Sequence, residues 1–537
     1  MRPPVRSSAM VAGALTIVGG CQVLTGIGGY ATDESLGSGA SPPSTTSAGG
    51  GGTPTSTTSA GEGGSGGGGI DVPPPVVVWR YAGTAPAGSF SRGQALGAAG
   101  GNDGAIRVVG TLGGSGVMLP EVSVPMGVAT RGLRFVLSGD TTPPSVSGAA
   151  PMVDLEGVHS ALTSVSRTGA AVRGGLQKPT AGTTALLIDT TTPPEFSLEN
   201  DDDVASFELG DTVTRVVGVQ QVSGSDVAFG ASFTGNTNLG NFPIDFPTAG
   251  RHALIARVAN DRLSFQWALQ LGPTGTEAGD LWIEDLAFDD GQVLAVGRYS
   301  GSSAAFGIRS NGPGPMTTTP LPMPTGTSQS VTDAFFVEFD LDDGMGGEVR
   351  GINQPGNQAF TEVERDQDNL YIGGHYSSTL AFGASPVATG PSDEERGFVA
   401  RLNPIGLAGA RVITFAGAPG SARVTSMAAR NDDVYVTVDC SGTIDVEVVV
   451  GLEAFERLFS SSGGNDDLCF FGFDMSTSPP SPTTAARFDG DVVRARDMIV
   501  DGGAAIVTGA YEGTWDLPGD PLQSEDEALF VLRLGLP

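Results

Sequence analysis

The sequence predicts an all-β protein: a seven-bladed β-propeller built from four-stranded antiparallel blades. Three observations predict this fold. The 3.6-residue periodicity of an amphipathic helix is absent from the chain after the first 69 residues. Turn-forming residues recur there at roughly every 8 to 15 residues, as is typical of short strands. One β-rich segment also recurs along the chain, which is the signature of a repeat architecture.

The recurring segment is predicted to be the second strand of each blade. Its seven copies are DGAIRVVGTLGG (from Asp103), AAVRGGLQ (Ala170), SDVAFGASFTG (Ser225), QVLAVGRYSG (Gln292), NLYIGGHYSS (Asn369), DVYVTVDCSG (Asp433) and GAAIVTGAYEG (Gly503). A third strand follows each copy: LRFVLS (Leu133), TALLID (Thr184), ALIARV (Ala253), AFFVEFD (Ala334), GFVARLN (Gly397), CFFGFD (Cys469) and ALFVLRL (Ala528).

Two further segments complete the repeat. The first strand precedes each copy, as in LWIEDLAFDDG (Leu281), VTSMAARND (Val424) and ARDMIVDGG (Ala495). The fourth strand follows the third, as in LSFQWALQLG (Leu263), RVITFAG (Arg411) and TAARFDG (Thr484).

The two ends of the repeat array fit each other. The sequence finishes on a third strand, ALFVLRLGLP, while VVVWRYAG (Val76–Gly83) resembles a fourth strand with no blade of its own. We therefore expect VVVWRYAG to complete the last blade and close the ring, since closure removes exposed sheet edges. The first two repeats are the most degenerate, which leaves a six- or eight-bladed ring as the alternative.

The N-terminal residues predict export and lipidation. Residues 1–20 read as a signal peptide, with Arg2 and Arg6 before an apolar run that is too short to span a bilayer. The residues VGGC (Val18–Cys21) resemble a lipobox, so we expect Cys21 to carry lipid; an ordinary signal peptide with a chance cysteine is the alternative. Gln22 follows it in place of aspartate, which favours the cell outer membrane and leaves the periplasmic or surface-exposed face open.

Three segments therefore organise the chain. Residues 1–20 are the signal peptide, residues 21–69 are the lipidated cysteine and a disordered Gly/Ser/Thr/Pro tether, and residues 70–537 are the propeller domain. The composition of the tether cannot bury enough apolar surface to offset chain entropy.

The repeat pattern resembles a known family. V-Y-V-T/G-G-x-Y/F-x-G followed by A-F-V-A-R-L is similar to the secreted β-propeller repeat of surface lipoproteins from myxobacteria-like bacteria. The resemblance covers most of residues 76–537, strongly from Ser225 onward. It implies a fold and carries no catalytic motif, and a shared fold does not imply a function.

Charge and motifs narrow the chemistry. The net charge of −31 argues against nucleic-acid binding, because an acidic surface repels phosphate backbones. The three histidines and three cysteines lack metal-ligand spacing, so we expect no catalytic residue, metal or cofactor. Acidic runs such as DLDDGMGGE (Asp340–Glu348) leave Ca²⁺ as an open alternative, although the glycine spacing of an EF-type loop fails there.

Cysteine and tryptophan positions predict structural roles. Cys440 and Cys469 lie in adjacent strands of one blade, so we expect a disulfide between them, with two separate buried thiols as the alternative. The four tryptophans are expected to pack between blades.

The predicted function is a lipid-anchored, non-enzymatic binding or interaction module, most simply a monomer held at the membrane by its lipid only. The alternatives are a propeller-based enzyme (glycoside-active or oxidoreductase) with a site over the central channel, and a purely structural envelope component. The longest connections between second and third strands are Ser302–Thr332, Thr379–Arg396 and Thr443–Asp467. We expect them to crowd one face and bind a basic protein or other cationic partner through Asp393, Glu394, Glu395, Asp466 and Asp467.

Overall fold

The computed structural model describes an all-β chain, which confirms the predicted class. It describes residues 72–98, 105–122, 131–138 and 144–154, short strands at 173–177 and 185–189, and most of residues 204–537. All the elements in these parts of the chain are strands, and neighbours within each sheet pair antiparallel. Accordingly, the described residues include no helix long and apolar enough to cross a membrane.

The strands form seven principal sheets, numbered here in chain order. They are β2–β5 (Phe90–Ala98, Ala105–Gly113, Arg131–Ser138, Val146–Asp154); β6–β8 (Arg173–Gln177, Ala185–Asp189, Val204–Glu208); β9, β10, β13 and β14 (Thr212–Gln221, Val227–Thr234, Arg251–Val258, Phe265–Leu271); β15, β16, β19 and β20 (Gly279–Asp289, Gln292–Gly301, Thr332–Asp340, Glu348–Ile352); β21, β22, β25 and β26 (Gln358–Asp366, Asn369–Tyr376, Arg396–Asn403, Gly406–Ala418); β27, β28, β31 and β32 (Ala422–Arg430, Asp433–Cys440, Asp467–Asp474, Ser481–Phe488); and β33, β34, β35 and β1 (Gly490–Asp501, Ala504–Trp515, Leu522–Gly535, Val76–Ala82).

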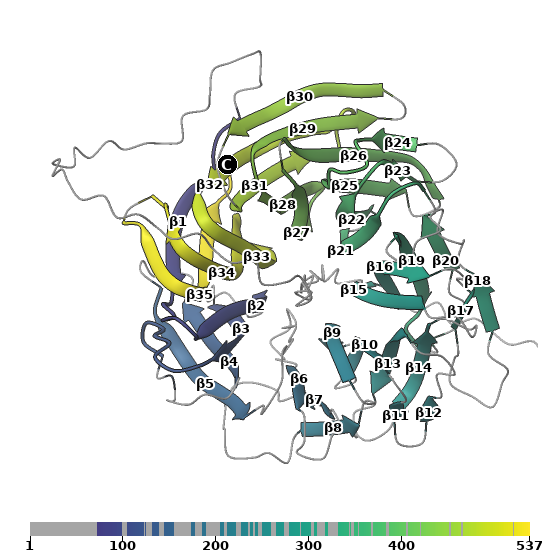
Figure 1. Ribbon diagram of the computed structural model, residues 1–537, viewed down its shortest axis with the longest axis horizontal. Coiled ribbons are helices and arrows are strands. Elements are labelled where there is room, and N and C mark those ends of the chain that lie inside the picture. The colour runs from purple at the N-terminus through teal and green to yellow at the C-terminus, as the bar shows by residue number, and fades with distance from the viewer. Residues whose placement is uncertain are drawn as a thin grey trace, which may run out of the picture.

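The sheets follow one another around the centre of the view in Figure 1. The strands nearest that centre include β2, β9, β15, β21, β27 and β33, called here the inner strands. Contacts between sheets run in sequence from β6 to β9, and on through β15, β21, β27 and β33 to β2. Each inner strand therefore packs against the inner strands on either side of it along this path.

Two-residue turns set the register where inner strands meet second strands. Asn431 and Asp432 join β27 to β28 with φ of 53° and 67°, and Gly502 and Gly503 join β33 to β34 with φ of 57° and 78°. Positive φ at both central residues is the geometry that matches the twist of a two-stranded hairpin, and Asn, Asp and Gly adopt it at low cost.

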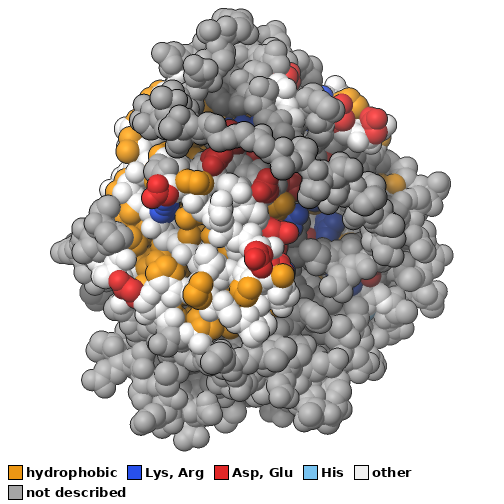
Figure 2. Space-filling view, turned by 60° about the vertical axis from the view of Figure 1, so that its left-hand side comes forward, with side chains coloured by type: hydrophobic (Ala, Val, Ile, Leu, Met, Phe, Trp, Pro, Cys, Tyr) orange, Lys and Arg blue, Asp and Glu red, His pale blue; other side chains and the backbone are white. Residues whose placement is uncertain are grey.

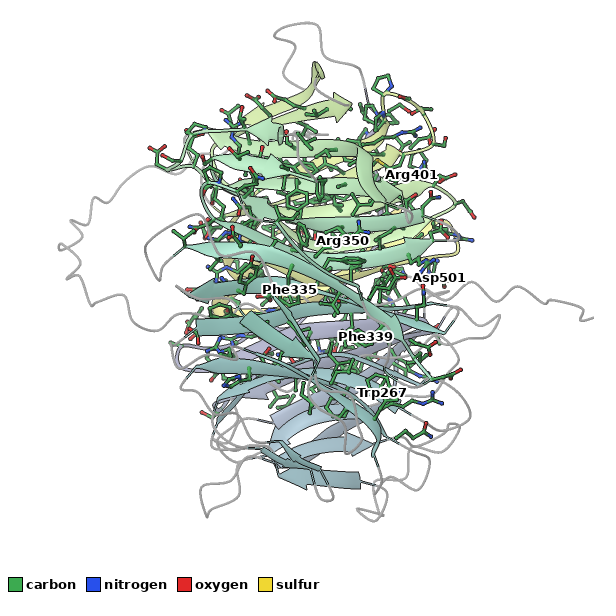
Figure 3. The ribbon with its side chains drawn as sticks, turned by 90° about the vertical axis from the view of Figure 1, so that its right-hand side faces the viewer. Trp267, Phe335, Phe339, Arg350, Arg401 and Asp501 are labelled. Atoms are coloured by element: carbon green, nitrogen blue, oxygen red, sulfur yellow. A yellow bond between two sulfur atoms is a disulfide. The ribbon has the colours of Figure 1, made fainter. Side chains whose placement is uncertain are left out.

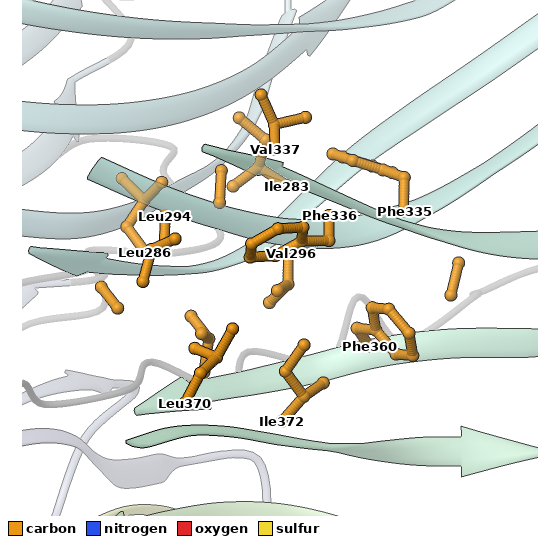
Figure 4. Packing of buried hydrophobic residues seen from close by; sticks show 14 of the residues in the cluster. Ile283, Leu286, Leu294, Val296, Phe335, Phe336, Val337, Phe360, Leu370 and Ile372 are labelled. Atoms are coloured by element: carbon orange, nitrogen blue, oxygen red, sulfur yellow. The ribbon is translucent and has the colours of Figure 1, made fainter. Parts of the chain in front are cut away.

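Apolar side chains from facing sheets fill the space between them. Between the fourth and fifth sheets, Val296 and Phe336 lie opposite Phe360, Leu370 and Ile372, and all five are buried (Figure 4). Burial of such side chains stabilises the fold by about 1.5–3 kcal/mol each, as an upper estimate.

Trp267 joins the third sheet to the fourth in the same way, as expected of the tryptophans. Its ring meets Phe339 edge to face with the ring centroids 6.0 Å apart (Figure 3), and its indole N–H donates to the carbonyl of Leu341 at 2.7 Å.

The segment VVVWRYAG forms the fourth strand of the last sheet. β1 pairs antiparallel with β35, with Val76 opposite Gly535 and Ala82 opposite Phe530. This is the pairing predicted for it, between segments from opposite ends of the chain.

The connections between second and third strands contain hairpins where the sequence predicted loops. Each sheet from the third to the sixth carries one: β11–β12 (Thr237–Leu239, Phe242–Ile244), β17–β18 (Ala305–Ile308, Thr317–Pro320), β23–β24 (Thr379–Ala381, Pro386–Thr389) and β29–β30 (Thr443–Val450, Glu453–Ser462). β11 contacts β8, β17 contacts β14, and β29 pairs fully with β26, so three of these hairpins reach the last strand of the preceding sheet.

The connection Thr443–Asp467 departs furthest from its prediction. β29 (TIDVEVVV) alternates β-branched and charged residues, which suits a strand, and it adds with β30 to the fifth sheet to make six strands. It covers an edge that β26 would otherwise present to solvent.

Candidate functional site

The candidate site begins with a β-bulge that recurs in five inner strands. In each, one residue is left without a partner on the second strand. These bulged residues are all polar and less than a tenth exposed: Gln94, Glu284, Thr361, Thr425 and Arg496. The repeat thus places one buried polar side chain at the inner edge of each of these five sheets.

The bulge explains the glycines of the repeat. A Cβ on Gly297 would lie 1.9 Å from the carbonyl oxygen of Trp282, and one on Gly509 would lie 2.0 Å from that of Arg494. Gly110 and Gly374 hold the equivalent places opposite β2 and β21. Only glycine tolerates so close a backbone.

Charged residues lie beside these bulges and link neighbouring sheets. We call the whole set the charged belt: Arg92, Glu527, Arg494, Asp466, Asp439, Arg423, Glu395, His375, Arg298 and Glu284. Figure 2 shows acidic and basic side chains close to one another on one face of the molecule, rather than one continuous acidic patch.

One half of the belt joins the last sheet to its two neighbours. Glu527 on β35 forms an ion pair with Arg92 on β2, and its other oxygen lies 3.9 Å from Arg494 on β33. Arg494 also lies 3.7 Å from Asp466, just before β31. The two arginines therefore share one carboxylate across the junction between β33 and β2.

The other half runs through the fourth, fifth and sixth sheets. Glu395, which precedes β25, pairs with Arg423 on β27 and lies 3.1 Å from Nε2 of His375 on β22. On the fourth sheet, Arg298 donates to Glu284 at 3.0 Å and lies over the Trp282 ring, 4.6 Å from its centroid. A guanidinium on an indole face gains cation–π attraction.

Burial changes the protonation of several belt residues. It raises the pKa of Asp439 to about 7, with Asp466 adding to the effect while Arg494, Arg423 and Arg496 oppose it. Burial also lowers the pKa of His375 to about 4, so the imidazole is neutral at pH 7. Burial acts to raise the pKa of Glu395, but His375 and Arg423 lower it overall.

The turns at the other ends of the strands carry a separate set of polar contacts. Arg401 and Asp501 lie on one side of the molecule in Figure 3, where third strands meet fourth strands and first strands meet second strands. Arg401 lies 3.2 Å from Asp432 there. Asp501 is the last residue of β33, whereas Arg494 lies nearer the start of that strand. The charged belt therefore lies toward the end of the sheets at which the second strands connect to the third strands.

The five carboxylates predicted to bind a partner fall at that end, but most of them face internal cations. Glu394 lies 3.6 Å from Arg396, and Glu395 and Asp466 belong to the belt. Asp467 is buried and accepts from Arg487 at 2.9 Å. Asp393 is exposed. A cationic partner at these loops stays a prediction, and Asp393 is the carboxylate best placed for it.

The disulfide prediction is confirmed. Cys440 and Cys469 are bonded, with Cα atoms 6.1 Å apart, across the second and third strands of the sixth sheet. The bond sits at the base of the connection that carries β29 and β30. Cys21, by contrast, lies outside the described residues.

The acidic side chains at the turns contact other groups of this chain and do not form a metal-binding site among the described residues. Asp342 lies 3.2 Å from Arg257, and its backbone N–H donates to Asp340 at 2.7 Å. Among the described residues, no group of three or more His, Cys, Asp or Glu side chains is arranged to hold a metal ion. The acidic run at residues 201–203 lies outside the described part.

Sequence reasoning missed the charged belt. Its signal is an arginine two residues before the bulge, in FSRGQ, ARVTS and VRARD, with tryptophan in LWIED. An alignment of the inner strands would reveal the recurring arginine. The sequence alone, however, does not show the bulge that gives this position the same place in each strand.

Comparison with known proteins shows no family for this chain. No protein-family model matches the chain, and no curated protein matches it either.

Proposed function

We propose that the protein is an outer-membrane or surface-anchored lipoprotein that displays an acidic seven-bladed β-propeller as a non-enzymatic binding module. In this proposal the seven principal sheets are the blades, β1 completes the last of them, and the first sheet packs on the second to close the ring. Cys21 carries the lipid and the tether lifts the propeller from the membrane.

The pairing of β1 with β35, and the run of contacts from β6 to β2, support the ring. Closure would leave no sheet of the ring without a packed neighbour on each side, which is how propellers protect their blades.

The observation that carries the binding function is the charged belt. It brings side chains of both signs from neighbouring sheets to one end of the inner strands, next to connecting segments, and binding residues are often held there by a rigid scaffold. Partly exposed members such as Arg423 and Arg494, with 41% and 38% of their side chains accessible, are available to a charged or polar ligand.

The test uses two arginines of one strand. Arg423 and Arg430 lie at opposite ends of β27, the first in the belt and the second exposed at the turn. Full-length wild type, R423Q and R430Q are immobilised and exposed to an extract of native envelopes. A component retained by wild type and R430Q but lost by R423Q supports the proposal. Equal retention by all three, or by none, contradicts it.

A second candidate, a glycoside-active enzyme, is favoured by one observation. Burial raises the pKa of Asp439 to about 7, and the negative charge of Asp466 contributes to this increase. A carboxyl group kept protonated near neutral pH beside a second carboxylate is the pairing used in glycoside hydrolysis. Hydrolysis of a polysaccharide panel by wild type, abolished in both D439N and D466N, would establish it over the binding module.

A further inference from the structure

Arg496 stands apart from the other bulged residues. The residue is 9% exposed, and its Nε has no hydrogen-bond partner. At the equivalent positions, Thr361 donates to the carbonyl of Val424 at 3.2 Å and Glu284 accepts from Arg298 at 3.0 Å. Arg496 therefore places a permanent positive charge with an unpartnered Nε where Thr361 and Glu284 are hydrogen-bonded. Gln94, at another of these positions, also has an unpartnered buried oxygen but carries no charge. Burying a cation without a matched anion is costly.

Charged groups from three sheets act electrostatically on this guanidinium. Arg92 on β2, Arg494 on β33 and Glu527 on β35 act on its charge, as does Asp439 on β28. Burial, reinforced by Arg92, lowers the pKa of Arg496 to about 10, so it is still a cation at pH 7. The junction of the sixth, seventh and first sheets thus holds a buried positive charge.

Exposure is graded around Arg496. The side chains of Arg92 and Arg494 are 29% and 38% accessible, and that of Asp466 is 54% accessible. Solvent thus reaches these three side chains, while Arg496 is almost fully buried. Three guanidinium groups here face two ion-paired carboxylates, those of Glu527 and Asp466. The third carboxyl group, that of Asp439, has its pKa raised to about 7 by burial and is mostly protonated at pH 6. One positive charge is left without a carboxylate of its own.

We propose that Arg496 is the floor of a binding site for a small organic monoanion, whose carboxylate it holds with Arg92 and Arg494 at the rim. A guanidinium fork matches the two oxygens of a carboxylate. A single uncompensated charge matches a monoanion, and the nearby carboxyl groups of Glu527, Asp439 and Asp466 disfavour a dianion. The inference rests on the proposed binding function and names its ligand class.

The experiment titrates full-length protein, kept in detergent, with monocarboxylates from acetate and lactate to glucuronate. Isothermal calorimetry is run at pH 6, with lactamide as the neutral counterpart of lactate and sulfate as a dianion. Saturable binding of at least one monocarboxylate is expected, with no binding of lactamide and weaker binding of sulfate. R496M, which keeps the side chain's length without its charge, should weaken binding at least tenfold. R430M removes an exposed arginine and should leave it unchanged.

Three results would overturn the site: no monocarboxylate binds, R496M binds as wild type does, or R430M loses binding to the same extent. If R496M does not fold, R494Q replaces it, since that side chain is partly exposed, and a loss of at least threefold is expected. Retained capture of an envelope component that depends on Arg423, together with no monocarboxylate binding, would remove this site while leaving the proposed function standing.

Discussion

The carboxylate of Asp497 accepts a hydrogen bond of 2.6 Å from the backbone N–H of Leu96, a residue 401 positions away in the sequence. Its other oxygen accepts from the N–H of Met498 at 2.8 Å. Asp285 repeats the arrangement, with the N–H of Val363 at 2.9 Å and that of Leu286 at 2.8 Å. Both aspartates directly follow the bulge of their inner strand and join it to the inner strand of the next sheet.

Replacing Asp497 with alanine should destabilise the fold strongly. The two backbone N–H groups would be left buried without acceptors, at about 1–3 kcal/mol each. Removal of the buried carboxyl group offsets part of that loss. Burial disfavours its charged form, as the pKa of Asp497, raised well above its usual value, indicates. Denaturant unfolding measures the change.

Asp501 provides the control, because it ends the same strand at the turn and is half-buried. D501A should change the free energy of unfolding by less than about 0.5 kcal/mol, as is usual for surface changes. Equal effects of D497A and D501A would contradict a specific link between β33 and β2.

Asp439 should make stability depend on pH. Its pKa is about 7 in the folded protein against an ordinary value of 3.8. Between these values the folded state keeps a proton that the unfolded chain has released, so stability falls as pH rises from about 4 to about 7. The charged groups acting on it are Arg494, Asp466, Arg423 and Arg496.

D439N removes this titration. Relative to wild type, the variant should gain stability as pH rises and the gain should level off above pH 7, as followed by unfolding at pH 4, 6 and 8. A wild type and variant whose difference in stability does not change with pH would contradict the raised pKa.

Much of the strand order could be predicted because each strand of the repeat has a recognisable local sequence pattern. Turn residues bound each strand, and the third strands AFFVEFD and GFVARLN form β19 and β25 as expected. The pairing of VVVWRYAG with ALFVLRL was also predictable, since one segment lacked a sheet and one sheet lacked a strand.

The site could not be predicted in the same way, because it depends on where strands from different sheets meet. Arg92 and Glu527 are 435 residues apart and join only through packing. Glu395 and Asp467 were expected to face a partner, but each meets a cation from another strand, Arg423 and Arg487 respectively. The acidic residues of a loop do not reveal which arginine of another strand will pair with them in the folded protein.

Loss of the disulfide should weaken the sixth sheet. Cys440 and Cys469 are 29 residues apart, and a cross-link over such a loop contributes about 3.5 kcal/mol in the chain-entropy model. The C440S/C469S variant should lose about that much, measured by denaturant unfolding. Wild type reduced with a thiol is the control. If reduction and the double substitution lower stability equally, the loss comes from the bond itself. If neither lowers stability, the prediction is contradicted.

Replacing Cys21 with serine should release the protein from membranes. The predicted acyl chains are the anchor in the proposed lipoprotein, and each buried CH₂ contributes about 0.8 kcal/mol to membrane binding. Fractionation without detergent compares C21S with wild type, and Q22S serves as a neighbouring control that should remain bound. C21S that sediments with membranes as wild type does would remove the lipid anchor from the proposal.

Deletion of Val76–Gly83 should abolish cooperative unfolding or cause aggregation. The segment contains β1, whose removal would leave the backbone groups of β35 unpaired along an edge and uncover its buried neighbours Trp515 and Phe530. If β1 also closes a ring, as proposed, the damage spreads beyond one sheet, because every sheet relies on its neighbours for packing. A deletion of eight residues within the tether, residues 50–57, is the matched control and should melt as wild type does. Calorimetry with light scattering distinguishes the two outcomes, and a Val76–Gly83 deletion that melts near the wild-type temperature in one cooperative step would refute closure by this strand.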